Sequence, residues 1–202
     1  MSYLVIIRHG QSEWNLQNRF TGSADVDLTP QGIEEAKKAG QLLKPYPFDK
    51  AYTSMLTRSI HTLKLILEQT GQQDLPTISD VALNERGYGD LQGLDKAAMA
   101  LKYSDEQILI WRRSYEVAPP GGESLKSTYD RIVAYFIKYI EPELKTGKNI
   151  LVVAHGNSLR ALMMHLENIT PEAIAEINLA TGVPRLYKYG GDLTLQNVAY
   201  LS

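Results

Sequence analysis

Two short apolar segments in opposite halves of the chain end on the same dipeptide. Residues 4–7, Leu-Val-Ile-Ile, lead through Arg8 to His9-Gly10, and residues 150–154, Ile-Leu-Val-Val-Ala, lead to His155-Gly156. Both runs are too short for a helix and are typical of strands buried on both faces of a parallel sheet. Ligands of open α/β sheets bind outside the carboxyl ends of the strands. The two histidines are therefore expected to face one another across a single site.

Strand and helix patterns alternate along the 202 residues, which indicates βαβ units and a mostly parallel sheet. A polar loop at 11–28 follows the first strand, and residues 49–53 form the next expected strand. One helix is expected to begin at Thr29-Pro30, and a second, capped by Ser54, to end at Gly71. The buried faces predicted for these helices are Ile33, Ala36, Gly40 and Leu43, and Ile60, Leu63, Ile66 and Leu67.

In the middle of the chain, the apolar residues follow no clear helical or strand period. A polar, glycine-rich stretch at 79–93 precedes two short helices, the second starting at Ser104 with Gln107 completing a capping box. The strongest helix breaker, Ala-Pro-Pro-Gly-Gly at 118–122, follows. No linker is long enough to divide the chain. We therefore expect a single domain over residues 1–202, with a helical insertion at about 80–122 over the active site.

Regular patterns return after this break. A helix is expected from about 123 towards 145, followed by the second His-Gly strand and a helix through Leu166. Thr170-Pro171 opens another helix. Residues 185–201 are expected to form two edge strands joined through Gly190-Gly191.

Composition narrows the classes of function. The chain has no cysteine, which excludes disulfides, thiolate catalysis and cysteine-ligated zinc. A net charge of −2 argues against a general nucleic-acid or membrane surface, so any anion site must be local. The N-terminus has no secretory pattern and no apolar run reaches transmembrane length, so we expect a cytoplasmic protein.

His9 is the first candidate for chemistry. A neutral imidazole attacks phosphorus and holds a phosphoryl group covalently, and the neighbouring Arg8 offers a positive fork to phosphate oxygens. A lone histidine is more often a buried structural residue, but the strand end, the arginine and Gly10 favour a functional role. His155, just before a helix start, could stabilise charge on a phosphoryl group in transit. Metal ligation by the two histidines is the weaker alternative, because arginines repel a metal ion.

Other polar residues become candidates for the site only if the fold brings them to the same edge of the sheet as the two histidines. Arg58 lies in the first turns of the helix after the second strand, and Glu85 beside a hydroxyl could act as general acid and base. Each is by default a solvated surface residue. Neutral donors and further cations are expected from Asn15, Thr21, Gly22, Lys96, Arg112 and Arg113.

Taken together, these motifs resemble the histidine phosphatase superfamily, and within it the cofactor-dependent phosphoglycerate mutases. Arg8-His9-Gly10 and residues 154–158, Ala-His-Gly-Asn-Ser, are similar to the two halves of the superfamily signature. The likeness to the mutases covers nearly the whole chain. It runs through the segments at 19–22, 25–28, 51–54 with Arg58, 83–86, 88–93, 111–113 and 181–184.

The resemblance implies a three-layer α/β sandwich and interconversion of 3-phosphoglycerate and 2-phosphoglycerate, with 2,3-bisphosphoglycerate as primer and intermediate and no metal. It makes His9 the phosphorylated nucleophile, Glu85 the proton donor and acceptor, and His155 the stabiliser of the transferring group, with Arg8 and Arg58 beside it. The implied substrate-binding residues are Gln11, Ser12, Asn15, Thr21, Gly22, Arg86, Tyr88, Lys96, Arg112, Arg113, Gly156 and Asn157.

Three positions depart from the family pattern. Gly87 stands where histidine is usual, so the geometry around Glu85 is expected to differ from that in the family. Ser23 stands where tryptophan is usual. Pro119-Pro120 runs directly into Gly121, without the long insertion that many members carry. The usual oligomer contacts are therefore in question, and we expect a monomer or a weak homo-oligomer.

Two other functions remain open on the same residues. A phosphatase would pass the phosphoryl group from His9 to water, and it needs the same histidines with Arg8 and Arg58. The cations that would retain a second anionic group favour the mutase. A phospholigand-binding module without catalysis is disfavoured, because a binder needs no proton shuttle such as Glu85.

Overall fold

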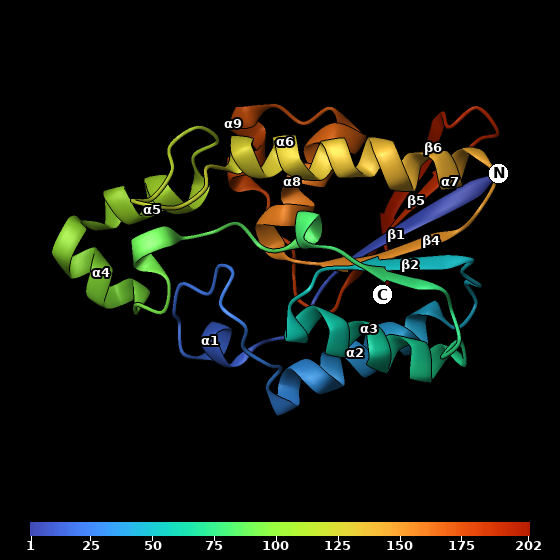
Figure 1. The fold of residues 1–202 in the computed structure, drawn as a ribbon, viewed down its shortest axis with the longest axis horizontal. Coiled ribbons are helices and arrows are strands. Elements are labelled where there is room, and N and C mark those ends of the chain that lie inside the picture. Colours follow the sequence, from blue (N-terminus) through green and yellow to red (C-terminus); the bar gives the residue numbers. More distant parts are fainter.

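A six-stranded sheet in the order β3-β2-β4-β1-β5-β6 runs through the protein (Figure 1). The structure, a computed structural model, describes residues 1–202. Strands β1 (Ser2–Arg8), β2 (Lys50–Thr53), β3 (Thr77–Ser79) and β4 (Ile150–Ala154) pair in parallel. Strand β5 (Pro184–Tyr189) is antiparallel to its sheet neighbour β1, and β6 (Leu195–Tyr200) is antiparallel to β5. The predicted mostly parallel α/β fold is confirmed.

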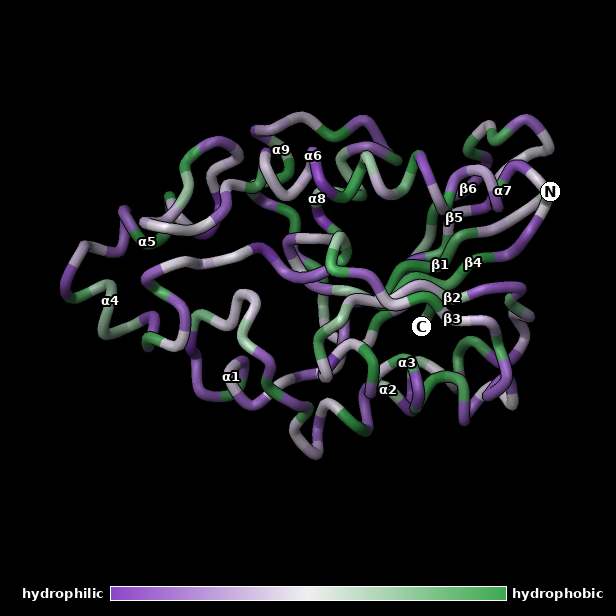
Figure 2. Tube along the Cα trace, viewed as in Figure 1, coloured by the Kyte–Doolittle hydropathy of each residue, from purple (hydrophilic) through white to green (hydrophobic).

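Residues 4–7 of β1 are all apolar because alternate residues enter two different cores. Leu4 and Ile6 pack in a cluster with residues of α6 (Leu125–Tyr135) and α8 (Gly156–Glu167). Val5 and Ile7 pack in a second cluster with residues of α2 (Pro30–Leu43) and α3 (Thr57–Thr70). Figure 1 shows these helix pairs on opposite faces of the sheet, which is the expected three-layer sandwich. Hydrophobic residues gather in the central strands (Figure 2).

The remaining elements are shorter. They are α1 (Glu13–Leu16), 3₁₀ turns Val81–Leu83 and Gly89–Leu91, α4 (Lys96–Tyr103), α5 (Asp105–Arg113), a π-helical turn Phe136–Ile140, α7 (Glu141–Lys145) and α9 (Pro171–Glu176). The π-helical turn and α7 continue α6 towards the start of β1 (Figure 1). In Figure 1, α4 and α5 project beyond the ends of β1 and β4. They fall in the stretch for which we predicted an insertion, and its assignment as part of a single domain stays a prediction. None of the helices is both long and apolar enough to cross a membrane.

The helix ends mostly follow the predicted signals, and the deviations have physical causes. Thr29 caps α2 by accepting the N–H of Gly32 at 3.1 Å, and Thr170 caps α9 through Ala173 at 3.3 Å. Ser104 caps α5 through the N–H of Gln107, but no reciprocal bond from the Gln107 side chain completes the predicted capping box. The prediction that Ser54 caps α3 is wrong, because α3 has Leu56 at its N-cap position and no side-chain cap of its own.

Two residues of the predicted buried faces are exposed. Ile33 and Ile60 are 36% and 37% exposed, respectively. The start of α3 turns Arg58, Ser59 and Thr62 inward, towards the ends of the central strands, so Ile60 faces outward. On α2 the buried face is instead Gly32, Ala36, Ala39, Gly40 and Leu43.

Four other elements differ from the sequence predictions. Strand β5 lies between β1 and β6, so of the two predicted edge strands only β6 is at an edge. The long helix predicted from about 123 begins at Leu125 after its cap Ser124, and a π-helical turn divides it. Helix α1 and strand β3 were not predicted, because each is only three or four residues long.

Candidate active site

The ends of β1 and β4 bring the two histidines together, as predicted. These strands are paired in parallel with Arg8 opposite Ala154, so His9 and His155 leave the same edge of the sheet. Their ring centroids are 4.9 Å apart. His9 is 3% exposed and His155 is fully buried.

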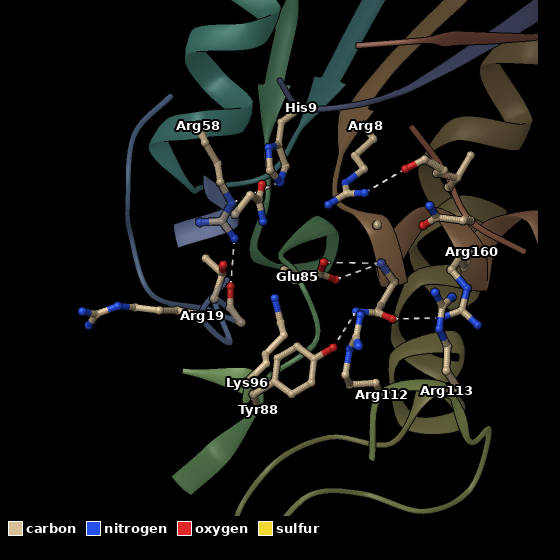
Figure 3. Close-up of a pocket in the computed structure, with 17 residues that line it drawn as sticks. Arg8, His9, Arg19, Arg58, Glu85, Tyr88, Lys96, Arg112, Arg113 and Arg160 are labelled. Carbon is tan, nitrogen blue, oxygen red and sulfur yellow. Dashed lines mark hydrogen bonds between the residues drawn. The ribbon is translucent and has the colours of Figure 1, made fainter. Parts of the chain in front are cut away.

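Hydrogen bonds to Gly10 and Arg58 fix the form of His9, and Figure 3 shows His9 beside Arg58. Nδ1 lies 2.7 Å from the carbonyl oxygen of Gly10, which only accepts, so Nδ1 carries the proton. Arg58 Nε donates to Nε2 at 3.3 Å, which places the lone pair on that nitrogen. Burial, together with the positive charges of Arg58 and Arg8, holds the pKa of His9 well below its usual range. These contacts and the lowered pKa favour a neutral imidazole whose lone pair is on Nε2.

His155 is held from behind by Ser54. The Ser54 hydroxyl accepts the N–H of Leu56 at 3.1 Å and lies 2.7 Å from Nε2 of His155. The hydroxyl can donate to Nε2 or accept from it, because a hydroxyl oxygen has two acceptor lone pairs. The other ring nitrogen of His155 is Nδ1. That nitrogen is buried and has no partner within the chain. Ser54 thus orients a histidine, and Asp25 occupies the helix end instead by accepting the N–H of Thr57 at 2.7 Å.

A pocket of about 150 Å³ opens beside His9 and is lined almost entirely by polar residues (Figure 3). Seven cationic side chains face a single carboxylate, that of Glu85. Such an excess of positive charge in a largely buried site favours a ligand with several negative charges. The cations are Arg8, Arg19, Arg58, Lys96, Arg112, Arg113 and Arg160.

Arg58 and Arg8 form the inner wall of this pocket. Arg58 is anchored by the carbonyl oxygens of Ala24 and Gly22, at 2.7 and 2.8 Å. Burial is the main reason that its pKa falls to about 10. Arg8 donates from Nη1 to the carbonyl oxygen of Leu179 at 2.8 Å, whereas its buried Nε has no partner. An unpaired buried donor beside His9 suits a site for an anion such as a phosphoryl group.

Glu85 presents one oxygen to the pocket and uses the other as an anchor. Oε1 accepts the backbone N–H groups of Arg86, Asn157 and Ser158 at 2.9, 3.1 and 3.3 Å. Oε2 is bound only by the N–H of Asn157, at 3.4 Å. Since α8 begins at Gly156 without a side-chain cap of its own, Glu85 caps that helix. The freer Oε2 is therefore the atom available for proton transfer.

The outer part of the pocket is a second group of donors. Tyr88 OH accepts from Arg86 Nη2 at 2.9 Å and from Asn157 Nδ2 at 3.4 Å, so its own proton is available to a ligand. Asn15 uses its side-chain oxygen for the N–H of Ser12, at 3.2 Å, so its amide hydrogens remain for the pocket. Burial, reinforced by Arg112 and Arg8, lowers the pKa of Lys96 to about 8.

Most of the residues predicted for the site line the pocket, but four of them do not. His155 lies behind His9, Ser12 caps α1, and Gln11 is engaged by Thr29 at 2.9 Å. Arg86 is fully buried and donates to the carbonyl oxygens of Trp111 and Arg112, so it supports the outer cations from behind. Gly10 also lies outside the pocket, packed against Gly32 of α2.

Four lining residues were not predicted. Arg19, Asn178 and Leu179 come from loops whose course the sequence does not reveal. Arg160 had a detectable signal: it follows Asn157 by three residues on a helix that is otherwise buried from Ser158 to Met164. Helical spacing places such a pair on one face.

The segment carrying Glu85 is clamped by a second acidic residue. Glu123 Oε2 accepts the N–H of Gly87 at 2.8 Å, and its own N–H donates to the Gly87 carbonyl oxygen at 2.8 Å. Arg131 pairs with Glu123 at 3.0 Å and donates to the carbonyl oxygens of Ala82 and Asn84. With glycine rather than histidine at position 87, Glu85 still lines the pocket. Ser23, the other departure, donates its hydroxyl to Gln92 at 3.1 Å.

Gly87→Ala is expected to leave the activity within about twofold and to raise the free energy of unfolding by about 0.4–1 kcal/mol. Gly87 does not have a positive φ, and an added Cβ would lie 3.8 Å from Glu123, an ordinary contact. The matched variant Gly89→Ala should destabilise strongly, because φ is +52° and the Cβ would lie 2.2 Å from the Pro120 oxygen. Urea unfolding and initial rates of both variants check this, and a large loss of activity in Gly87→Ala would contradict it.

No group of three or more His, Cys, Asp or Glu side chains comes together in a way that could hold a metal ion. The arrangement instead offers a neutral nucleophilic imidazole, a carboxylate oxygen for proton transfer and a surrounding set of positive donors. Such a site is suited to moving a phosphoryl group.

Comparison with known proteins agrees with this geometry. Residues 4–196 match the model of the histidine phosphatase superfamily, branch 1. The 2,3-bisphosphoglycerate-dependent phosphoglycerate mutase of Cytophaga hutchinsonii is 60% identical, and the match covers 100% of this chain and 94% of that protein. The mutase of the same name from Afipia carboxidovorans is 57% identical over 96% of this chain and 95% of its own length.

Solved structures show that the fold is shared more widely. The alpha-ribazole phosphatase of Shigella flexneri superposes with a TM-score of 0.83 over 97% of this chain and 95% of its own. At 24% identity this likeness concerns the fold alone. The chain belongs to branch 1 of the histidine phosphatase superfamily and, within it, to the family of 2,3-bisphosphoglycerate-dependent phosphoglycerate mutases.

Proposed function

We propose that this protein interconverts 3-phosphoglycerate and 2-phosphoglycerate by way of a phosphorylated His9. The observation that carries the proposal is the division of the pocket into two parts. Its inner part surrounds His9 Nε2 with Arg8 and Arg58, and its outer part adds Lys96 and Arg112. A substrate with a phosphate and a carboxylate, or with two phosphates, has an anionic group for each part.

Phosphoryl transfer would begin and end at Nε2 of His9. In the phosphorylated enzyme, the hydroxyl oxygen on C2 of 3-phosphoglycerate attacks phosphorus as the bond from phosphorus to Nε2 breaks. Glu85 Oε2 takes the hydroxyl proton, and the product of this half-reaction is 2,3-bisphosphoglycerate. After the ligand reorients, Nε2 attacks the phosphorus at C3, and Glu85 returns the proton to the departing oxygen. The products are 2-phosphoglycerate and phosphorylated His9, ready for another cycle.

The neighbouring groups would stabilise charge on the group in transit. Arg8 Nε is a buried donor and His155 Nδ1 is a buried ring nitrogen, and neither has a partner in the chain. Protonated at Nδ1, His155 would donate to the transferring group. Gly156, the first residue of α8, adds an N–H at the positive end of that helix, and its missing Cβ would have come within 3.5 Å of Arg8. Catalysis would thus rest on positioning and fixed charge, and no step in this sequence calls for a metal.

The phosphoglycerates and 2,3-bisphosphoglycerate are the proposed small-molecule partners. The unpaired Arg8 Nε and Thr21 hydroxyl, both buried in the wall of the pocket, fit a ligand rich in phosphate oxygens. We place the reaction in the cytoplasm with the other steps of glycolysis and gluconeogenesis. A monomer or a weak homo-oligomer remains our prediction for the assembly.

A phosphatase is the competing function, because the fold and the inner part of the pocket would serve both enzymes. An enolase-coupled assay with 3-phosphoglycerate separates them. The mutase forms 2-phosphoglycerate at a rate that rises on addition of 2,3-bisphosphoglycerate and is unchanged by a chelator. Release of inorganic phosphate without 2-phosphoglycerate would instead identify a phosphatase, and neither product would leave only a binding protein.

The pH dependence of kcat/KM is expected to report Lys96. Its lowered pKa of about 8 means that the free enzyme loses this positive charge above that pH. A bound anion favours the charged form, so kcat/KM should fall above pH 8 by up to about tenfold per unit. In Lys96→Arg the charge persists, and the profile should stay flat to about pH 9.5. Identical profiles for the two proteins would contradict the assignment.

A further inference from the structure

Arg160 is a buried arginine on the wall of the pocket that has no acidic partner. It lies on α8, is 4% exposed, and is among the residues that line the pocket beside Arg113 (Figure 3). Nη1 donates to Asn157 Oδ1 at 3.0 Å, and Nη2 donates to the carbonyl oxygen of Ile174. Nε is buried with no partner.

The bond to Asn157 decides which way that amide points. With Oδ1 engaged by Arg160, the Nδ2 group of Asn157 is directed to the hydroxyl of Tyr88, at 3.4 Å. Tyr88 also accepts from Arg86 at 2.9 Å, so its proton is left for a ligand. Arg160 therefore sets the orientation of two neutral donors in the outer part of the pocket.

The positive charges around Arg160 also favour a bound anion. Arg86, Arg113 and Arg160 lie close enough that the first two help burial to lower the pKa of Arg160 to about 10. None of the three belongs to an ion pair of the protein. The carboxylate of Glu85 offsets part of this repulsion, and an anionic ligand would offset more of it.

We propose that Arg160 is a positioning residue that enables the outer part of the pocket to retain the second anionic group of a phosphoglycerate. It does so by holding Asn157 and Tyr88 as donors and by adding positive charge behind Arg113. This proposal rests on the proposed function for the identity of the ligand. A purely structural role, in which Arg160 only ties α8 to α9 through Ile174, makes a different prediction.

Binding to a protein that cannot turn over gives the first test. In a His9→Ala background, calorimetric titration with 3-phosphoglycerate should show a Kd raised about tenfold by Arg160→Gln. Arg160→Lys, which keeps the charge but not the planar fork, should raise it about threefold. This measurement does not depend on mutase turnover, so it still reports on Arg160 if the wild-type protein forms no 2-phosphoglycerate.

The inner part of the pocket supplies the contrasting readout. With His9 intact and charged by saturating 2,3-bisphosphoglycerate, spontaneous loss of phosphate from His9 should change less than twofold in Arg160→Gln. Arg185→Gln is the matched control: Arg185 is another well-covered arginine, paired with Glu167 at 2.6 Å and absent from the pocket lining. Arg185→Gln should lower the Tm without changing the Kd.

Either of two kinds of result would overturn the proposal. One is an unchanged Kd for 3-phosphoglycerate in Arg160→Gln. The other is a Kd and a phosphohistidine decay rate that shift together, or a Kd weakened equally by Arg185→Gln, since either marks a general loss of structure.

Discussion

His9→Ala is expected to abolish mutase turnover, with a loss on the order of 10⁴-fold or more, while the protein stays folded. His9 is the only histidine that lines the pocket, so no neighbouring imidazole replaces it. The variant should also form no acid-labile phosphoenzyme. Coupled rates and acid-quenched phosphoprotein measure the two effects.

The matched control for this variant is His61→Gln. His61 is a half-exposed histidine that pairs with Asp27 and does not line the pocket, so its removal should leave the activity within about twofold. Full mutase activity in His9→Ala, or an equal loss in His61→Gln, would contradict the assignment of the nucleophile.

Glu85→Gln is expected to lower kcat by about 10²- to 10⁴-fold with little change in KM, as for the loss of a general acid and base. Glutamine retains an oxygen to accept the N–H groups of Asn157 and Ser158, so the cap of α8 and the position of the side chain should persist. What it cannot do is take and return the substrate proton. Steady-state rates and the Kd of 3-phosphoglycerate separate these effects.

Glu34→Gln provides the comparison for Glu85→Gln. Glu34 is an exposed carboxylate on α2 that pairs with Lys37, and its substitution should not change kcat. A kcat of Glu85→Gln within threefold of the wild-type value would show that another group moves the proton.

The central strands were predictable because their signal is local and their geometry is general. Residues 4–7 and 150–154 are continuous apolar runs, and burial on both faces of a parallel sheet explains both of them. Once these strands are parallel neighbours, the meeting of His9 and His155 follows. Arg58 was found for a similar reason, since the start of α3 lies at the same edge.

Other features depend on contacts that no local pattern encodes. Ser54 has the residue type and position of a helix cap, yet Asp25 from a distant loop takes that role and frees Ser54 for His155. The outward turn of Ile60 has the same origin, because polar residues needed at the site occupy the inner face of α3. In both cases the demands of the site override the usual local preference.

The outer part of the pocket was predicted from the resemblance more than from physics. Arg86 resembles a ligand-binding arginine in sequence but is fully buried behind the pocket, whereas Arg160 lines it. Three-residue spacing from Asn157 was the only sequence signal for Arg160. Buried charges of this kind become interpretable only when their partners are seen.

The fate of a labelled phosphoryl group tests the central claim most directly. Enzyme charged with 2,3-bisphosphoglycerate carrying ³²P, freed of excess ligand and chased with unlabelled 3-phosphoglycerate, should lose label from His9 within the turnover time. We expect the label to appear in 2,3-bisphosphoglycerate and 2-phosphoglycerate. Label recovered chiefly as inorganic phosphate, or never bound to His9, would contradict it.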